Sequence, residues 1–189
     1  MLAPTIAVPT DQRVLMTFRL DRQLYALPIA PVVQIIEMVA IIPLPQVHAA
    51  IRGVVNWHGT LAPVIDLRGY LGLPEVPPRA DTHIILAQVG GRLTGLIVDT
   101  ALDVIHLSGH EIVHPADILP IGLTETSRVV EGLARTPNGL VLLLDLEQLT
   151  THSPLNFAAV SSALAAQSVA SAEPAPDQIA TDPIPERVA

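Results

Sequence analysis

The sequence predicts an all-β fold, built as a pair of small barrels with a few short helices. Short alternating or aliphatic runs recur along the chain, and glycine or proline turns separate them. Hydrophobic residues make up 50% of the chain but aromatic residues only 3%, so the core must be aliphatic. Strands this apolar cannot bury both faces in one small open sheet, whereas closure into barrels removes the exposed edges.

The first predicted element is an antiparallel hairpin. Apolar side chains occupy every second position of residues 14–20, which is the period of a strand. Residues 21–23 supply a turn, and residues 24–29 return as the partner strand.

A short helix is predicted next. Pro31 suits a first helical turn, because its missing N–H costs nothing there. Val32, Ile35 and Ile36 then fall on one helical face, while Gln34 lies off it. Such a face belongs to the core by default, and the alternative is a docking surface for a partner.

Residues 53–67 predict a second hairpin, which is the stretch most informative about function. Asn56, Trp57, His58 and Gly59 form its reversal, since Gly59 accepts a positive φ that other residues resist. Pro63 has no N–H to give to a ladder, so we expect its strand to be an edge or to carry a break. The hairpin is apolar and carries one imidazole at its tip, which predicts a surface that another protein binds.

The second half of the chain repeats the pattern of short strands. Gly90-Gly91 and Asn138-Gly139 each separate two β runs, and both pairs favour a hairpin turn. The expected strands are residues 82–89, 93–99, 101–107, 128–135 and 140–146, with a short helical or loop element at 67–73 and a helical turn at 147–151.

Composition divides the chain into three parts. Residues 1–12 are expected to form a flexible arm, and residues 13–152 the folded region. Residues 153–189 are rich in Ala, Ser and Pro and have little apolar periodicity, so we expect a disordered tail.

Charge and cysteine usage exclude several classes of function. The net charge is −8 and the ten basic residues are dispersed arginines, so a nucleic-acid partner is not expected. The chain has no cysteine, which excludes disulfides, thiolate catalysis and cysteine metal sites. No apolar run approaches the ~20 residues of a spanning helix, and no signal-peptide pattern is present. These observations predict a cytoplasmic protein without direct membrane insertion.

Candidate catalytic groups are few. His106, His110 and His114 lie four residues apart and would line one face of a helix as a zinc site. A strand end and Ser108-Gly109 interrupt that helix, so a strand-to-loop segment is favoured and a histidine-based metalloenzyme is the remote alternative. Four aspartates could supply carboxylate pairs for acid–base catalysis: Asp66, Asp99, Asp103 and Asp145. Three of them end aliphatic strands, where hydrogen bonding in a turn is the favoured role.

An ordered set of short motifs runs through about residues 13–152. The motifs are Phe18-Arg19-Leu20, Tyr25-Ala26-Leu27-Pro28-Ile29, Val32-Val33-Gln34-Ile35-Ile36, Pro43-Leu44-Pro45, Ile51-Arg52-Gly53-Val54-Val55-Asn56, Gly59, Pro63-Val64-Ile65-Asp66-Leu67, Gly95-Leu96-Ile97-Val98-Asp99, Val104-Ile105, Glu131-Gly132 and Leu142-Leu143-Leu144-Asp145. In this order they resemble the CheW-like coupling proteins of bacterial chemotaxis.

The resemblance implies a fold and a function. The fold would be two intertwined five-stranded SH3-like barrels, with aliphatic cores inside and between them. It implies no enzyme activity and no cofactor. The protein would bridge the cytoplasmic tip of a methyl-accepting chemoreceptor to the regulatory domain of a CheA-type histidine kinase, in arrays at the inner membrane. The alternative partner scheme is a stand-alone regulator of another kinase, outside motility.

The same resemblance implies which residues contact partners: Val32, Gln34, Ile35, Gly53, Asn56 and His58. Gly53 is included because a side chain there would block close approach of a partner backbone. Two positions depart from the family pattern. His58 stands where the family usually has arginine, and Gln34 where it often has glutamate.

Overall fold

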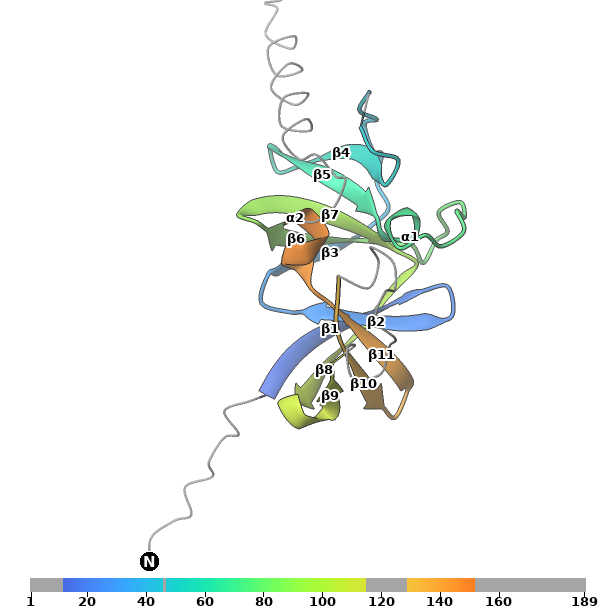
Figure 1. The fold of residues 1–189 in the computed structure, drawn as a ribbon. Coiled ribbons are helices and arrows are strands. Elements are labelled where there is room, and N and C mark those ends of the chain that lie inside the picture. Colours follow the sequence, from blue (N-terminus) through green and yellow to red (C-terminus); the bar gives the residue numbers. More distant parts are fainter. Residues whose placement is uncertain (1–11, 46, 115–128, 152–189) are drawn as a thin grey trace, which may run out of the picture.

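Two β-sheets, one above the other in Figure 1, make up most of the described part of this computed structural model. The described residues are 12–45, 47–114 and 129–151. Strands dominate them and the helices are short, which confirms the predicted all-β class. The predicted arm lies outside the described residues except for Gln12, and so does the predicted tail, residues 153–189.

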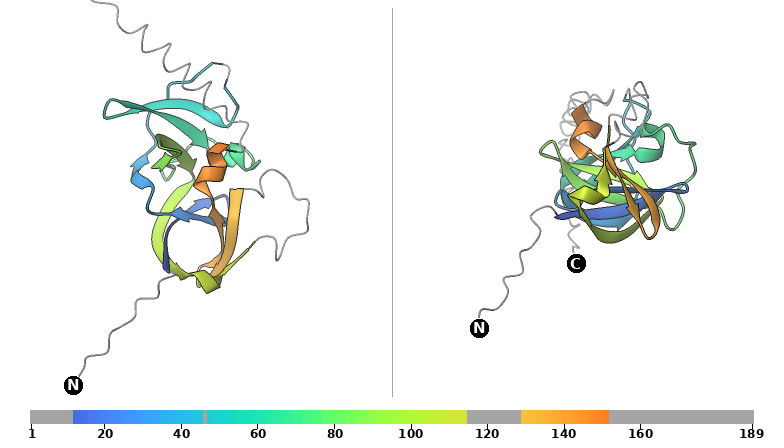
Figure 2. Two further views of the ribbon diagram at one scale, coloured as in Figure 1. Left: turned by 60° about the vertical axis from the view of Figure 1, so that its left-hand side comes forward. Right: turned by 60° about the horizontal axis from the view of Figure 1, so that its bottom comes forward.

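The first sheet has the strand order β8-β1-β2-β11-β10-β9. Its outermost strands are consecutive in the chain, because the 3₁₀ turn Gly109–Glu111 joins β8 to β9, and the sheet curls round in Figure 2. The two-residue β9 is a sixth strand where the family resemblance implies five. The bounds are β1 Gln12–Leu20, β2 Gln23–Pro28, β8 Thr100–Ser108, β9 Ile112–Val113, β10 Val130–Thr136 and β11 Gly139–Leu144.

The second sheet has the order β3-β6-β7-β5-β4. The chain leaving β3 crosses to the far edge, where Ile42 N donates to Val54 O at 2.9 Å and Val54 N donates to Ile42 O at 2.8 Å. These two bonds connect the β3 end of the sheet to β4. The bounds are β3 Val32–Glu37, β4 Ile51–Trp57, β5 Thr60–Asp66, β6 His83–Val89 and β7 Arg92–Val98.

The first sheet is built from two separate stretches of the chain, β1–β2 and β8–β11. The second sheet is one continuous stretch, β3 to β7, inserted between β2 and β8. The first sheet is completed when β11 pairs in parallel with β2, with Leu142 opposite Tyr25. Strands from the two ends of the described region are therefore neighbours.

Three aliphatic clusters hold the sheets together. One lies between the sheets and includes Phe18 and Leu27 from the first and Ile85 and Leu96 from the second. The second cluster belongs to the first sheet alone: Leu15, Ala26, Leu107, Ala134, Val141 and Leu143. The third belongs to the second sheet alone: Val55, Ala62, Val64, Ile84, Leu86 and Ile97. Successive side chains of a strand point to opposite faces of its sheet, so the two faces pack into different clusters. This is the arrangement expected for cores between and inside two subdomains.

The predicted helix over residues 32–36 is wrong, because this segment is strand β3. The ladder with β6 shifts by one residue between Val32 and Gln34, so β3 carries a bulge. Val32 and Ile35 pack against the cluster between the sheets, whereas Ile36 packs against the other face. Val32 and Ile35 are three residues apart in the sequence, and the bulge places both side chains on the same face of β3, which imitates helical periodicity.

Of the two alternatives expected for the strand of Pro63, the edge strand is wrong, because β4 and β7 flank β5. The parallel pairing with β7 begins only at Val64, opposite Gly95, so Pro63 has a partner strand on one side only. The missing N–H is tolerated there because the second ladder has not yet begun.

Two short helices follow strands as expected. Asp66 caps α1 (Leu67–Tyr70) and Asp145 precedes α2 (Leu146–Thr151). Asp145 Oδ1 accepts from Glu147 N at 2.8 Å and from Gln148 N at 3.1 Å. No helix in the described part of the chain has the length and apolarity needed to cross a membrane.

Candidate partner-binding surface

Three of the predicted partner-contact residues, Val32, Gln34 and Ile35, lie on β3, an edge strand of the second sheet. Gln34 is exposed, whereas Val32 and Ile35 are half-buried against the cluster between the sheets. The bulge leaves Val33 51% exposed beside Gln34. Val33 is therefore a surface residue that sequence reasoning missed, because the bulge that exposes it has no signature in the sequence.

The remaining predicted residues lie on β4 and on its turn into β5, at the other side of the same sheet. Asn56 and His58 are exposed, and Asn56 Oδ1 accepts from Gly59 N at 2.8 Å. His58 and Gly59 both have positive φ, 49° and 86°, which is the geometry of a tight hairpin turn. The backbone thus presents the imidazole at the tip, as predicted.

The imidazole of His58 at the tip packs against the ring of Trp57. The rings of Trp57 and His58 meet edge to face, with centroids 4.4 Å apart. Trp57 is half-buried and packs against the cluster of the second sheet. Through Trp57 this contact connects the exposed tip to the core of the second sheet.

Gly53 has a role inside the fold. Its φ is +141°, and a β-carbon built on it would lie 2.0 Å from Ile42 O and 2.7 Å from Ile42 C. The close backbone approach that the glycine permits is therefore with the chain's own Ile42, at the link between β3 and β4. Gly53 is buried, and its effect on a partner would act through the position of β4.

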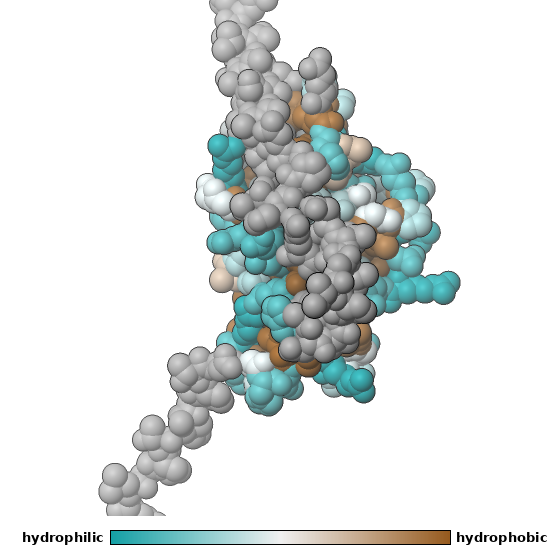
Figure 3. Space-filling model, in the orientation of Figure 1, coloured by the Kyte–Doolittle hydropathy of each residue, from teal (hydrophilic) through white to brown (hydrophobic). Residues whose placement is uncertain are grey.

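Hydrophobic side chains are exposed on β3, on the link from β3 to β4 and on β5. Val33 and Val39 are 51% and 47% exposed, and Ile42 and Leu61 are 51% and 38% exposed. Figure 3 shows hydrophobic surface at the top of the view, near β4, and further hydrophobic surface at the lower edge of the molecule. Exposed apolar surface rimmed by polar groups is typical of protein contact sites.

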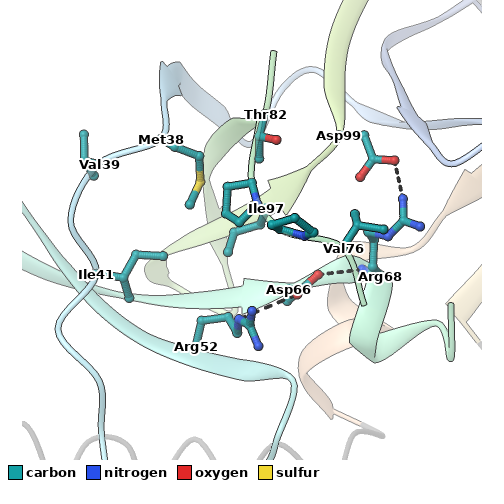
Figure 4. A pocket seen from close by; sticks show the side chains of 12 residues that line it. Met38, Val39, Ile41, Arg52, Asp66, Arg68, Val76, Thr82, Ile97 and Asp99 are labelled. Atoms are coloured by element: carbon teal, nitrogen blue, oxygen red, sulfur yellow. Dashed lines mark hydrogen bonds and ion pairs between the residues drawn. The ribbon is translucent and has the colours of Figure 1, made fainter. Parts of the chain in front are cut away.

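Next to this surface lies a cavity of about 250 Å³, shown in Figure 4, whose lining is largely apolar but includes Arg52, Asp66, Arg68 and Asp99. Arg68, whose side chain is 8% exposed, bonds the carboxylate of Asp99, and its Nε donates to Pro74 O at 2.9 Å. Asp66 accepts from Arg68 N at 2.9 Å and faces Arg52 Nε at 3.7 Å. Sequence reasoning missed both arginines, because their carboxylate partners come from other strands: Asp99 follows β7 and Asp66 ends β5.

This ionic cluster links the two sheets. Asp99 follows β7 and also accepts from Asp21 N at 2.6 Å, in the turn between β1 and β2. Arg68 Nη2 lies 3.9 Å from Asp21 Oδ1. Asp66, Asp99 and Asp145 thus accept hydrogen bonds at strand ends, as predicted. Two of them also form ion pairs, Asp66 with Arg52 and Asp99 with Arg68.

The three histidines considered for zinc do not share a helix. His106 lies on β8, His110 in the 3₁₀ turn and His114 just beyond β9, and all three are exposed. Across the described ranges no group of three or more His, Cys, Asp or Glu side chains is placed to hold a metal ion.

Comparison with known proteins gives one consistent family. The model of the CheW-like domain matches residues 14–153. "Probable chemotaxis protein CheW" of Rhizobium etli is 30% identical over 141 residues, 75% of this chain and 89% of its own. "Chemotaxis protein CheW" of Bacillus subtilis is 31% identical over 142 residues, 75% and 88% of the two chains. The crystal structure of the scaffolding protein TtCheW from Thermoanaerobacter tengcongensis matches with a TM-score of 0.67 and 30% identity, over 74% of this chain and 92% of that one.

Proposed function

Because the chain belongs to the CheW-like domain family of non-catalytic chemotaxis scaffolds, we propose that it couples chemoreceptors to a CheA-type histidine kinase. One partner is the cytoplasmic tip of a methyl-accepting receptor, and the other is the regulatory domain of the kinase. The protein then works in the cytoplasm, beside receptor arrays at the inner membrane. The observation that carries the proposal is the family match over residues 14–153, which spans both sheets.

The second sheet offers the contact surface. Gln34, Asn56 and His58 are exposed and make direct contacts in this proposal. Val32 and Ile35 are half-buried, so they supply apolar area at the edge and fix the position of β3. Protein interfaces combine an apolar centre with a polar rim. The exposed Val33 on β3 can supply apolar area, and the tip with Asn56 and His58 can supply polar groups.

His58 sets the partner preference in this proposal. The arginine usual in the family presents five donors, and a partner carboxylate pairs with it in two places. An imidazole is shorter and has two ring nitrogens, so the partner surface facing His58 must lie closer and make fewer bonds. We expect the cognate partner to carry a matching change.

Calorimetry tests the proposal with two purified ligands, a receptor-tip fragment and the regulatory domain of a CheA-type kinase encoded by the same genome. We expect the full chain to bind both at once. His58→Asn keeps a side chain that tolerates positive φ, and should weaken one of the two complexes about fivefold to thirtyfold. His110→Asn is the matched control, because His110 is an exposed histidine of the first sheet.

Three results discriminate the alternatives. Binding to the kinase domain alone would favour the stand-alone regulator of a kinase. Binding to neither ligand would remove the coupling proposal. Equal losses for His58→Asn and His110→Asn would leave the coupling role intact but move the contact surface away from the tip of β4 and β5.

A further inference from the structure

The first sheet encloses a cavity of about 650 Å³ at the end where its hairpins turn. The lining comes from β1, β2, β8, β10 and β11, from the turns β1–β2 and β10–β11, and from the 3₁₀ turn that follows β8. Gln23 Nε2 donates to Leu140 O at 2.8 Å, which ties the two hairpins together beside it. The volume lies within the ~300–1,000 Å³ of small-molecule sites, and the mouth of a curled sheet is a frequent place for them.

The inner wall of the cavity is apolar. Leu24, Ile105, Leu107 and Val141 line it and belong to the cluster of the first sheet. Leu24 and Ile105 are only half-buried, so part of their surface faces the cavity. A ligand that covered these side chains would gain about 25 cal/mol for each Å² of apolar surface removed from water.

The rim of the same cavity gathers arginines. Arg19, Arg22 and Arg135 line it, and none of them makes an ion pair with another described residue. The carboxylates of Asp103 and Glu111 also line the cavity, and Glu111 already accepts a hydrogen bond from Ser108 N at 2.7 Å. Three guanidinium groups at one opening stand out in a chain whose net charge is −8.

We propose that this mouth, formed by the first sheet, binds a small amphipathic carboxylate. The apolar part enters between Leu24, Ile105 and Val141, and the carboxylate pairs with the rim arginines, whose planar fork suits carboxylate oxygens. The site is separate from the partner surface, which lies on the second sheet.

Methyl NMR of the full chain, titrated with octanoate, tests the proposal. We expect saturable shifts at the methyl groups of Leu24, Ile105 and Val141, and none at Val64 or Leu86 in the second sheet. 1-Octanol and octylammonium share the apolar chain but lack the carboxylate, so each should bind about tenfold more weakly.

Variants then assign the carboxylate contact. Arg19→Gln combined with Arg135→Gln should lower octanoate affinity at least tenfold, with the rest of the methyl spectrum unchanged. Arg79→Gln is the control, since Arg79 is exposed, makes no ion pair with other described residues and lies at a different cavity. Shifts in the second sheet, equal binding of 1-octanol, or an equal effect of Arg79→Gln would each overturn the proposal.

Discussion

Replacing Gly53 by alanine should open the link between β3 and β4. The new β-carbon would lie 2.0 Å from Ile42 O, so the backbone at Ile42 must move. The two Ile42–Val54 hydrogen bonds are then lost, at about 1 kcal/mol each. Holding alanine at a φ of +141° costs a further ~1–3 kcal/mol.

Together these terms lower the free energy of unfolding by about 3–5 kcal/mol, or the melting temperature by roughly 10–15 °C. Urea unfolding of the full chain, followed by circular dichroism, measures the loss. Gly72→Ala is the control, because Gly72 has a φ of +71° but nothing within 4 Å of its built β-carbon. It should lose about 1 kcal/mol. Equal losses for the two variants would refute the role assigned to Ile42.

Three further predictions concern buried polar groups. Arg68→Met leaves Asp99 without its guanidinium and should cost about 3 kcal/mol. Arg13→Met removes an ion pair with Glu131 whose side chains are 37% and 33% exposed, so it should cost less than about 1 kcal/mol in the same urea assay. Burial, with a smaller contribution from a nearby aspartate, raises the pKa of Tyr25 above its usual 10.0. The folded chain then holds the phenol proton more tightly, so stability is complete below pH 10 and falls as the pH rises through the folded pKa. Tyr25→Phe should abolish that alkaline fall, which unfolding free energies measured against pH would reveal. Thr94 is fully buried and its Oγ1 has no hydrogen-bond partner among the described residues, so Thr94→Val should leave stability unchanged or raise it by up to about 1 kcal/mol. A loss of more than about 1 kcal/mol would contradict the assignment.

The local signals in the sequence were sufficient for most hairpins but not for β3. Alternation and the pairs Gly90-Gly91 and Asn138-Gly139 placed their hairpins correctly, since a turn depends on residues that are adjacent in the chain. The spacing of Val32 and Ile35 favoured a helix because the bulge in β3 breaks the alternation. A bulge is set by pairing with β6, about fifty residues away, and is invisible in a local pattern.

The predicted surface shows the same limit. The exposure of Gln34 and His58 and the tip at Asn56 followed from the turn and the motifs. The need for glycine at position 53 was predicted, but its neighbour was not, because Ile42 reaches it only after the second sheet closes. Arg68 was missed for a similar reason, since its carboxylate partner arrives from the end of β7.

The order in which the strands meet has a consequence for biosynthesis. Strands β3 to β7 are contiguous, so the second sheet can assemble as soon as it has left the ribosome. The hairpin of β1 and β2 must wait for β11, which is translated on the order of ten seconds later. During that interval its apolar faces, including Phe18 and Leu27, have only the nascent second sheet to cover them. A chaperone that engages growing chains would be expected to act on this hairpin first.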